Sequence, residues 1–133
     1  MTDDGIARVA DYMSMTFQSI DREATVHEAI AQLKEHDLNA LIVDRRDEDD
    51  EIGLVTVTDV AREVMGKHRP PDRTYVFEIM TKPIVTLPAR MKVVYATRLL
   101  ANLDLSQAVV TDETNHPIGI VNRRDLVFAC LED

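Results

Sequence analysis

The stretch Ile52-Gly53-Leu54-Val55-Thr56-Val57-Thr58-Asp59-Val60 decides the fold, because it returns in similar form 66 residues further along the chain. The second copy reads Ile118-Gly119-Ile120-Val121-Asn122-Arg123-Arg124-Asp125-Leu126. In both copies two apolar residues follow the glycine directly, and an aspartate six positions after the glycine is followed by another apolar residue. Such a run predicts a buried strand that leads into a helix, with the aspartate as N-cap or in the first turn.

The similarity between the two halves extends well beyond these stretches. At an offset of 67 residues, residues 12–14 match residues 79–81, and Val26, Ala29 and Leu33 match Val93, Ala96 and Leu100. A period this long, present only twice, indicates two fused half-domains rather than an open solenoid. We therefore predict repeat 1 over residues 1–67, a linker with two prolines over 68–74, and repeat 2 over 75–133.

Each repeat is predicted to run helix, strand, helix, strand, strand, helix. Thr25 and Glu28 form a capping box at the start of the second helix of repeat 1. The predicted helices cover residues 6–13, 26–36, 75–80 and 92–103, and two more begin near Asp59 and Asp125. The predicted strands cover residues 17–20, 40–43, 52–57, 84–87, 107–110 and 118–121.

Composition narrows the classes of function. The 24 acidic and 15 basic residues give a formal net charge of -9, which disfavours nucleic acid and anionic membranes as partners. No apolar run approaches the roughly 20 residues of a membrane span. The start of the chain is acidic, unlike a signal peptide, and the single cysteine, Cys130, excludes an intramolecular disulfide. These features predict a cytoplasmic location.

Motifs for catalysis are missing from the sequence. The four glycines, Gly5, Gly53, Gly66 and Gly119, form neither a dinucleotide-binding motif nor a phosphate loop. His27-Glu28 lacks the second histidine of a zinc protease, because Ala31 stands there. No Ser–His–Asp, Cys–His or paired-carboxylate arrangement can be placed, so we predict that the protein is not an enzyme and requires no metal or cofactor.

The repeated motif resembles the CBS domain, a repeat named after cystathionine β-synthase that occurs in pairs. The most specific feature of that family is a glycine, two apolar residues, Ser or Thr, two variable residues and Asp at a strand-to-helix junction. Residues 53–59 match it fully, and residues 119–125 match it except that Asn122 replaces the hydroxyl residue. The apolar-Met-Ser/Thr segments at 12–14 and 79–81 support the resemblance, which covers the chain from about Ile6 to Leu131.

The resemblance implies an α/β fold of two pseudo-symmetric CBS repeats, each with a small three-stranded sheet and flanking helices, packed as one module. It also implies two clefts between the repeats, which in this family often bind AMP, ADP, ATP or S-adenosylmethionine. A carboxylate at a helix N-terminus can accept hydrogen bonds from both ribose hydroxyls, and free N–H groups attract phosphate. Each cleft combines the aspartate motif of one repeat with the opening strand of the other.

Carried over by residue, the first site comprises Thr56, Thr58, Asp59, Lys82, Pro83, Ile84 and Val85. The second, which departs from the pattern at Asn122, comprises Ser14, Met15, Thr16, Phe17, Gln18, Asn122, Arg123 and Asp125. Cations that can neutralise a phosphate lie close to both motifs in the sequence. They are Arg62, Lys67, His68 and Arg69 after the first motif, and Arg123 and Arg124 within the second.

The sequence therefore predicts a regulatory module that senses an adenosyl ligand and signals to a separate, unidentified partner protein, with a homodimer as its assembly. The alternative is a ligand-free structural dimer. Two repeats of 66 residues account for 132 of the 133 residues, so we expect the regulated protein to be a separate molecule.

Simpler structural roles exist for the same residues. In these alternatives Asp59 and Asp125 cap their helices without binding a ligand, and Thr56 is simply a residue of a buried strand. The acidic residues 44–51 lack the glycine and ligand spacing of a calcium loop and are expected to be solvated. Cys130 is expected to be packed or dimer-facing. The aromatic residues are expected in the core or in an interface: Tyr12, Phe17, Tyr75, Phe77, Tyr95 and Phe128.

Overall fold

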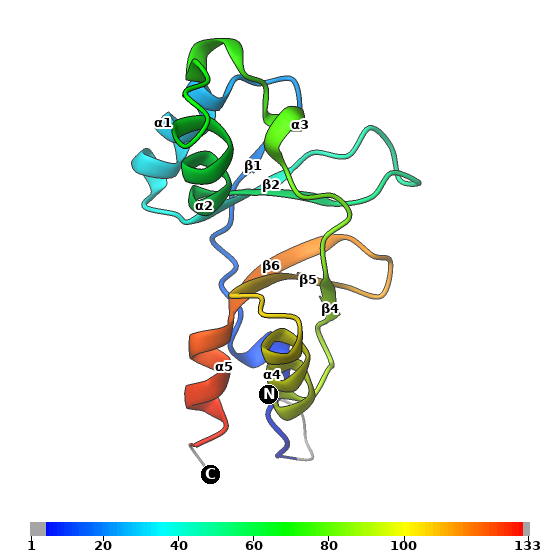
Figure 1. Cartoon of the computed structure of the whole chain (residues 1–133). Helices are drawn as coiled ribbons and strands as arrows, with labels where there is room; N and C mark the ends of the chain where they lie inside the picture. Colours follow the sequence, from blue (N-terminus) through cyan, green and yellow to red (C-terminus); the bar gives the residue numbers. More distant parts are fainter. Residues whose placement is uncertain (1–4, 132–133) are drawn as a thin grey trace. The chain divides into compact units, whose positions relative to one another are not determined.

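The computed structural model describes residues 5–131, which form two compact units (Figure 1). The central unit comprises residues Phe17–Ile84. The terminal unit joins the two ends of the chain, residues 5–16 and 85–131 of the described part. Most of the acidic start of the chain, residues 1–4, lies outside the described residues, as do residues 132–133.

The central unit holds a three-stranded sheet of order β1-β2-β3. Strand β1 (Ser19–Ile20) runs parallel to β2 (Ala40–Val43), which is antiparallel to β3 (Gly53–Thr56). Helix α1 (Val26–His36) connects β1 to β2, as a parallel pair requires. After β3 come α2 (Val57–Val60), the π-helical turn η2 (Ala61–Met65), the 3-10 turn η3 (Pro71–Arg73) and α3 (Val76–Ile79).

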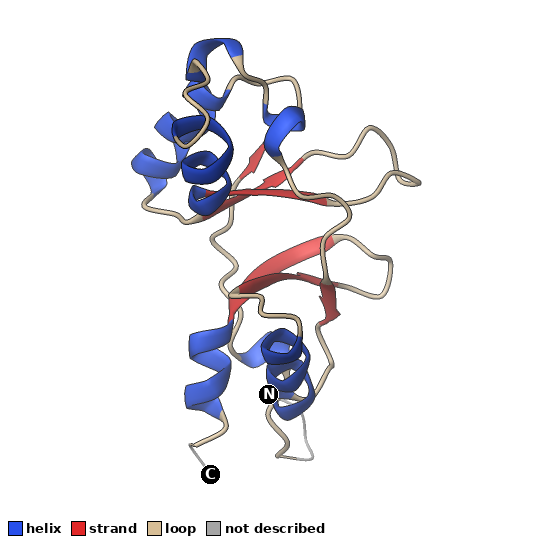
Figure 2. Cartoon of the chain, viewed as in Figure 1, coloured by secondary structure: helices blue, strands red, loops and turns tan. Residues whose placement is uncertain are grey.

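The terminal unit repeats this arrangement. Its sheet has the order β4-β5-β6, with β4 (Thr86–Pro88) parallel to β5 (Gln107–Thr111) and β5 antiparallel to β6 (Pro117–Asn122). The 3-10 turn η1 (Val9–Asp11) opens the unit, α4 (Val93–Asn102) connects β4 to β5, and α5 (Arg123–Ala129) follows β6. Within each unit the helices cover one face of the sheet (Figure 2). The predicted α/β class, with two three-stranded sheets and flanking helices, is confirmed.

The core of each unit follows from the periodicity of its elements. In the central unit, Leu41 and Val43 alternate along β2 and pack with Val26, Ala29 and Leu33, which lie three and four residues apart on α1. The corresponding residues Val93, Ala96 and Leu100 of α4 pack with Ala108 and Val110 of β5. The matching positions found by comparing the two halves of the sequence are therefore the core positions of both units.

Each unit contains the body of one repeat and the opening segment of the other. Helix α3, which opens repeat 2, packs in the central unit, where the Val76 N–H donates to the Ala24 carbonyl at 2.9 Å. Turn η1, near the start of repeat 1, packs in the terminal unit, where the Val9 N–H donates to the Met91 carbonyl at 2.9 Å. The compact units thus cut across the predicted repeats.

Each opening segment also pairs with the third strand of its unit. Thr81 and Leu54 exchange backbone hydrogen bonds of 2.9 and 3.0 Å, and Ser14 and Ile120 exchange bonds of 2.8 and 3.0 Å. The methionine before each pairing residue then lies over the motif glycine. A Cβ at Gly53 would lie 3.0 Å from Met80 Sδ, and a Cβ at Gly119 would lie 2.7 Å from Met13 Sδ. The two glycines are present because these segments approach the strand so closely.

Several predicted elements differ from the structure. The helix predicted over residues 6–13 is only the turn η1, because the N–H groups of Val9 and Ala10 donate to the loop before α4 instead of within a helix. Asp59 and Asp125, predicted at the N-cap or in the first turn of their helices, lie in the first turns of α2 and α5, and Thr56 and Asn122 are the N-caps. Of the two places predicted for the six aromatic residues, core or interface, the core does not apply to four that are exposed: Tyr75, Phe77, Tyr95 and Phe128.

Within residues 5–131, none of the helices is long and apolar enough to cross a membrane. The acidic residues 44–51 form an exposed turn-rich loop between β2 and β3, apart from the half-buried Arg45 and Asp50. Among the described residues no group of three His, Cys, Asp or Glu side chains is arranged to hold a metal ion.

The close approach at the glycines predicts a difference between two alanine variants. At Gly119 an added Cβ would lie 2.9 Å from the Ser14 carbonyl oxygen, whereas at Gly53 the nearest backbone atom, the Thr81 oxygen, is 3.6 Å away. A methionine side chain can move, but a paired backbone cannot, so Gly119→Ala should cost about 1–3 kcal/mol of stability and Gly53→Ala less. Urea unfolding followed by circular dichroism measures both. Equal losses would show that the backbone approach is unimportant.

Candidate functional site

The motif aspartate of the central unit is held in a reciprocal capping box. Thr56 Oγ1 accepts a hydrogen bond from the Asp59 N–H at 3.0 Å, and Asp59 Oδ2 accepts from the Thr56 N–H and hydroxyl, both at 2.9 Å. The Asp59 side chain is only 7% exposed. Its other oxygen, Oδ1, accepts from Arg62 Nη2 at 3.2 Å. Sequence and structure together thus place a carboxylate, fixed in orientation, at the end of β3.

The second motif is built on the same plan but has one hydrogen bond where the first box has three. Asn122 Oδ1 accepts from the Asp125 N–H at 2.8 Å, so the residue that departs from the family pattern serves as the N-cap of α5. Asp125 is exposed, and among residues 5–131 its carboxylate contacts no hydrogen-bond or ion-pair partner. The two motif carboxylates therefore differ: that of Asp59 is buried and paired, and that of Asp125 is open.

The opening segments bring the second half of each predicted site to the motif strand. Thr81 pairs with Leu54 of β3 in an antiparallel bridge, so Lys82, Pro83 and Ile84 follow within the central unit in the direction of the start of that strand, away from Thr56 and Asp59. The bond between Lys82 and Pro83 is cis. Six of the seven residues of the first predicted site lie in the central unit, and the seventh, Val85, begins the second part of the terminal unit.

The second predicted site is divided in a similar way. Ser14 pairs with Ile120 of β6, and its hydroxyl lies 2.9 Å from that of Thr16, so both accompany Asn122, Arg123 and Asp125 in the terminal unit. Met15 belongs to the same unit and is 74% exposed. Phe17 and Gln18 belong to the central unit, where the Gln18 carbonyl accepts from the Ile42 N–H at 3.0 Å.

Lys82 has a partner that the sequence did not indicate. Its ammonium group forms an ion pair with Asp50 Oδ1, at the end of the acidic loop 44–51. The Asp50 carboxylate also accepts from the backbone N–H groups of Arg46 at 2.9 Å and Glu51 at 3.0 Å. These contacts lower the pKa of Asp50 to about 2, with the Arg46 N–H the largest cause and Lys82 next. No local pattern joins residues 32 positions apart, so only the fold reveals this pair.

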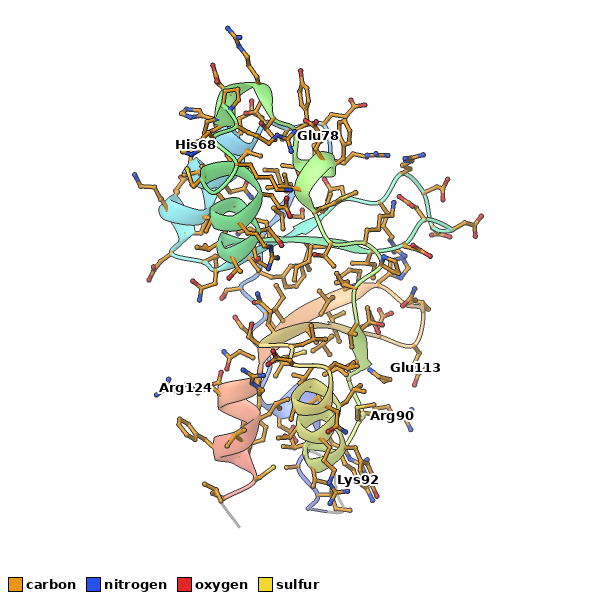
Figure 3. All side chains as sticks on the ribbon, in the orientation of Figure 1. His68, Glu78, Arg90, Lys92, Glu113 and Arg124 are labelled. Atoms are coloured by element: carbon orange, nitrogen blue, oxygen red, sulfur yellow. The ribbon has the colours of Figure 1, made fainter. Side chains whose placement is uncertain are left out.

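Most of the cations expected near the motifs contact residues outside the motifs. Lys67 pairs with Glu63, Arg69 Nη2 lies 2.8 Å from Glu78 Oε1, and Arg123 Nη1 lies 3.4 Å from Asp104 Oδ1. The guanidinium of Arg124, on α5, lies 4.9 Å from the centre of the Phe128 ring (Figure 3). His68 is exposed after η2. Within the described residues, Arg62 is the cation whose side chain contacts a motif aspartate.

The lowered pKa of Asp50 can be tested directly. We expect its carboxyl carbon to titrate near pH 2 in an NMR pH titration. Because this pKa lies below the roughly 4 of an unfolded chain, the ionised form stabilises the fold above about pH 4, and this contribution is lost as the pH falls toward 2. Lys82→Met should raise the pKa part of the way, because the Arg46 N–H remains. Lys67→Met, which breaks the pair with Glu63, is the control and should leave it unchanged. A parent value near 4 would contradict the pairing.

A model of the CBS domain family matches the chain twice, over residues 9–66 and 76–132. The two matches confirm the resemblance that rests on the glycine-aspartate motifs. Among curated proteins, an uncharacterised protein of Methanopyrus kandleri is 25% identical over 103 residues, which are 77% of this chain and 52% of that protein. The chain spans between 23% and 52% of the length of its first curated relatives, one of which is named homoserine O-acetyltransferase.

Solved structures agree with the fold. The hexameric CBS-CP12 protein from bloom-forming cyanobacteria superposes with a TM-score of 0.88 and 32% sequence identity, over 93% of this chain and 68% of that one. The cytosolic domain of the Mg2+ channel MgtE in complex with ATP has a TM-score of 0.74 and 23% identity, over 92% of this chain and 48% of that one. The second similarity shows a shared fold.

Proposed function

Because the chain belongs to the CBS domain family, we propose that it is a regulatory module that senses an adenine nucleotide or a related adenosyl ligand and signals to a separate partner protein. The observation that carries the proposal is the arrangement at the two motifs. In each unit an aspartate from one repeat stands at the end of a strand that pairs with the opening segment of the other repeat. A ligand that contacts both segments would thus contact both repeats.

The chemistry of the motif suits a ribose. One carboxylate can accept hydrogen bonds from two adjacent hydroxyl groups, and the capping box already fixes the orientation of Asp59. Within the same unit, Pro83 and Ile84 of the opening segment are proposed as the surface for the adenine ring. The exposed carboxylate of Asp125, beside Arg123 and Arg124, offers the same acceptor in the second site.

The ligand class is supported by the complex of the MgtE domain with ATP, which has this fold. AMP, ADP, ATP and S-adenosylmethionine all carry the ribose that the motif is suited to accept. CBS pairs of this kind are generally regulatory, so no catalytic step is part of the proposal, and neither is a required cofactor. The curated relatives are longer than this chain, so they do not indicate which protein it regulates. The proposal therefore names no particular partner.

Self-association belongs to the same proposal. Between α1 and the segment of α2 and η2 runs an apolar groove of about 310 Å3, lined mainly by Ile30, Leu33, Val57, Val60, Ala61 and Met65. Val57 and Met65 are 48% and 54% exposed, and Tyr95 and Phe128 of the terminal unit are similarly exposed at 53% and 48%. We propose that a second copy covers such faces in a homodimer; the CBS-CP12 relative is hexameric. A cytoplasmic location, which the single cysteine suits, completes the proposal.

The role of Asp59 can be separated from its capping function by a matched pair of variants. Asp59→Ala should abolish the ribose contact and weaken AMP and ATP binding by at least about tenfold, since it removes an acceptor from bound hydroxyl groups. Glu28→Ala removes the equivalent carboxylate from the capping box of α1, where Glu28 Oε2 accepts from the Thr25 N–H at 3.1 Å. It should lower stability without changing affinity. Isothermal calorimetry and thermal melts measure the two effects. Unchanged affinity in Asp59→Ala would contradict the assignment.

A panel of ligands distinguishes the sensor from a ligand-free structural dimer. Any compound that binds the folded state alone must stabilise it, by about 2.7 kcal/mol when its concentration is 100 times the Kd. We therefore expect the melting temperature to rise when AMP, ADP, ATP or S-adenosylmethionine is added, and NADH serves as a comparison. A flat response to the whole panel favours the structural dimer.

A further inference from the structure

Arg62 pairs with the motif aspartate of the central unit, and we infer that this arginine makes the site selective for phosphorylated adenosine over the unphosphorylated nucleoside. The inference rests on the proposed function, because it concerns the same site. It adds the residue of this chain that chooses among adenosine ligands.

The hydrogen bonds of Asp59 leave one oxygen for a ligand. Oδ2 already accepts from both the N–H and the hydroxyl of Thr56, and the Thr56 hydroxyl in turn accepts from the Asp59 N–H. This box holds the start of α2 together, so breaking it would also loosen the helix. Among residues 5–131, Oδ1 accepts only from Arg62 Nη2, at 3.2 Å. A ribose hydroxyl that donates to Asp59 therefore meets Arg62 as its competitor.

Arg62 is able to leave this position. Its side chain is 63% exposed, and its contact with Asp59 is a single hydrogen bond rather than a bidentate pair. Water solvates the guanidinium, which weakens its pairing, whereas the buried Asp59 carboxylate needs a hydrogen-bond donor in its place, which a ribose hydroxyl can be. Glu63 Oε1 lies 3.9 Å from Arg62 Nε, a longer contact than that with Asp59, and Glu63 Oε2 is paired with Lys67, which lowers the pKa of Glu63. Once Arg62 leaves Asp59, its remaining ion pair among the described residues is this long contact with Glu63.

The chemistry of the ligand determines whether Arg62 gains a new partner when it gives up its hydrogen bond to Asp59. Arg62 lies one helical turn after Asp59, on the same face, so its guanidinium stays close to a ribose bound at Oδ1. A nucleotide brings a phosphate, to which a guanidinium donates two parallel hydrogen bonds. A nucleoside displaces Arg62 from Asp59 and offers no anion in return. The same arginine therefore opposes the nucleoside and favours the nucleotide.

The second repeat supplies an internal contrast. The residue three positions after Asp125 is Phe128, whose ring contacts Arg124 at 4.9 Å. Among the described residues no cation pairs with the Asp125 carboxylate. The second motif thus has an open carboxylate without the competing arginine, and its preference for phosphate cannot arise by exchange at that position.

The test compares AMP with adenosine by isothermal calorimetry in an Asp125→Ala background, so that binding is confined to the Asp59 site. Arg62→Gln should weaken AMP binding, strengthen adenosine binding, and so lower the ratio of the adenosine Kd to the AMP Kd by at least about tenfold. Arg90→Gln is the matched control, because its exposed guanidinium pairs with Glu113 in the terminal unit and it belongs to neither predicted site, and it should leave the ratio unchanged.

Each outcome bears on a different statement. If the Asp125→Ala protein binds AMP and Arg62→Gln changes both affinities by the same factor, or neither, the inference is wrong and the proposed function stands. If the Asp125→Ala protein binds neither compound while its melting curve is that of a folded protein, the proposed role of the Asp59 site is wrong and the inference falls with it. A thermal melt of Arg62→Gln close to that of its parent confirms that the comparison concerns binding, not folding.

Discussion

The close approach of an opening segment to the third strand of each sheet is the constraint on which the rest of the structure depends. Met13 over Gly119 and Met80 over Gly53 let the following residue, Ser14 or Thr81, pair with the strand backbone. That pairing attaches the start of one repeat to the body of the other. It also places most of the residues of each candidate site in the same unit as the motif aspartate.

Local chemistry explains which elements the sequence predicts well. Helix α1 begins and ends where its sequence predicts, because the Thr25–Glu28 box fixes its start and Asp37, in a left-handed conformation with φ of 51°, ends it. The buried strand β2 is equally clear from its unbroken apolar run. The segment before Met13 has helical spacing, yet tertiary hydrogen bonds to Ala89 and Met91 override it. Spacing alone cannot reveal bonds to residues about 80 positions away.

The candidate site shows the same division. Its residue types and its two motifs were readable in the sequence, and so was the departure at Asn122. The partners were not: Lys82 with Asp50 and Arg62 with Asp59 are products of the fold, and they change what those side chains offer a ligand. The two repeats share one backbone plan but differ in their charged side chains, so the two candidate sites differ in character.

The exchange of opening segments has a consequence for how such a chain arises. A single repeat by itself would lack part of a core and would leave the edge beside its third strand unpaired, which favours association with another chain. Two identical copies could satisfy each other by trading those segments, as domain-swapped dimers do. Duplication and fusion would then turn an intermolecular exchange into an intramolecular one. In this view the fused chain is a covalently linked dimer, and its linker replaced the dependence of folding on concentration.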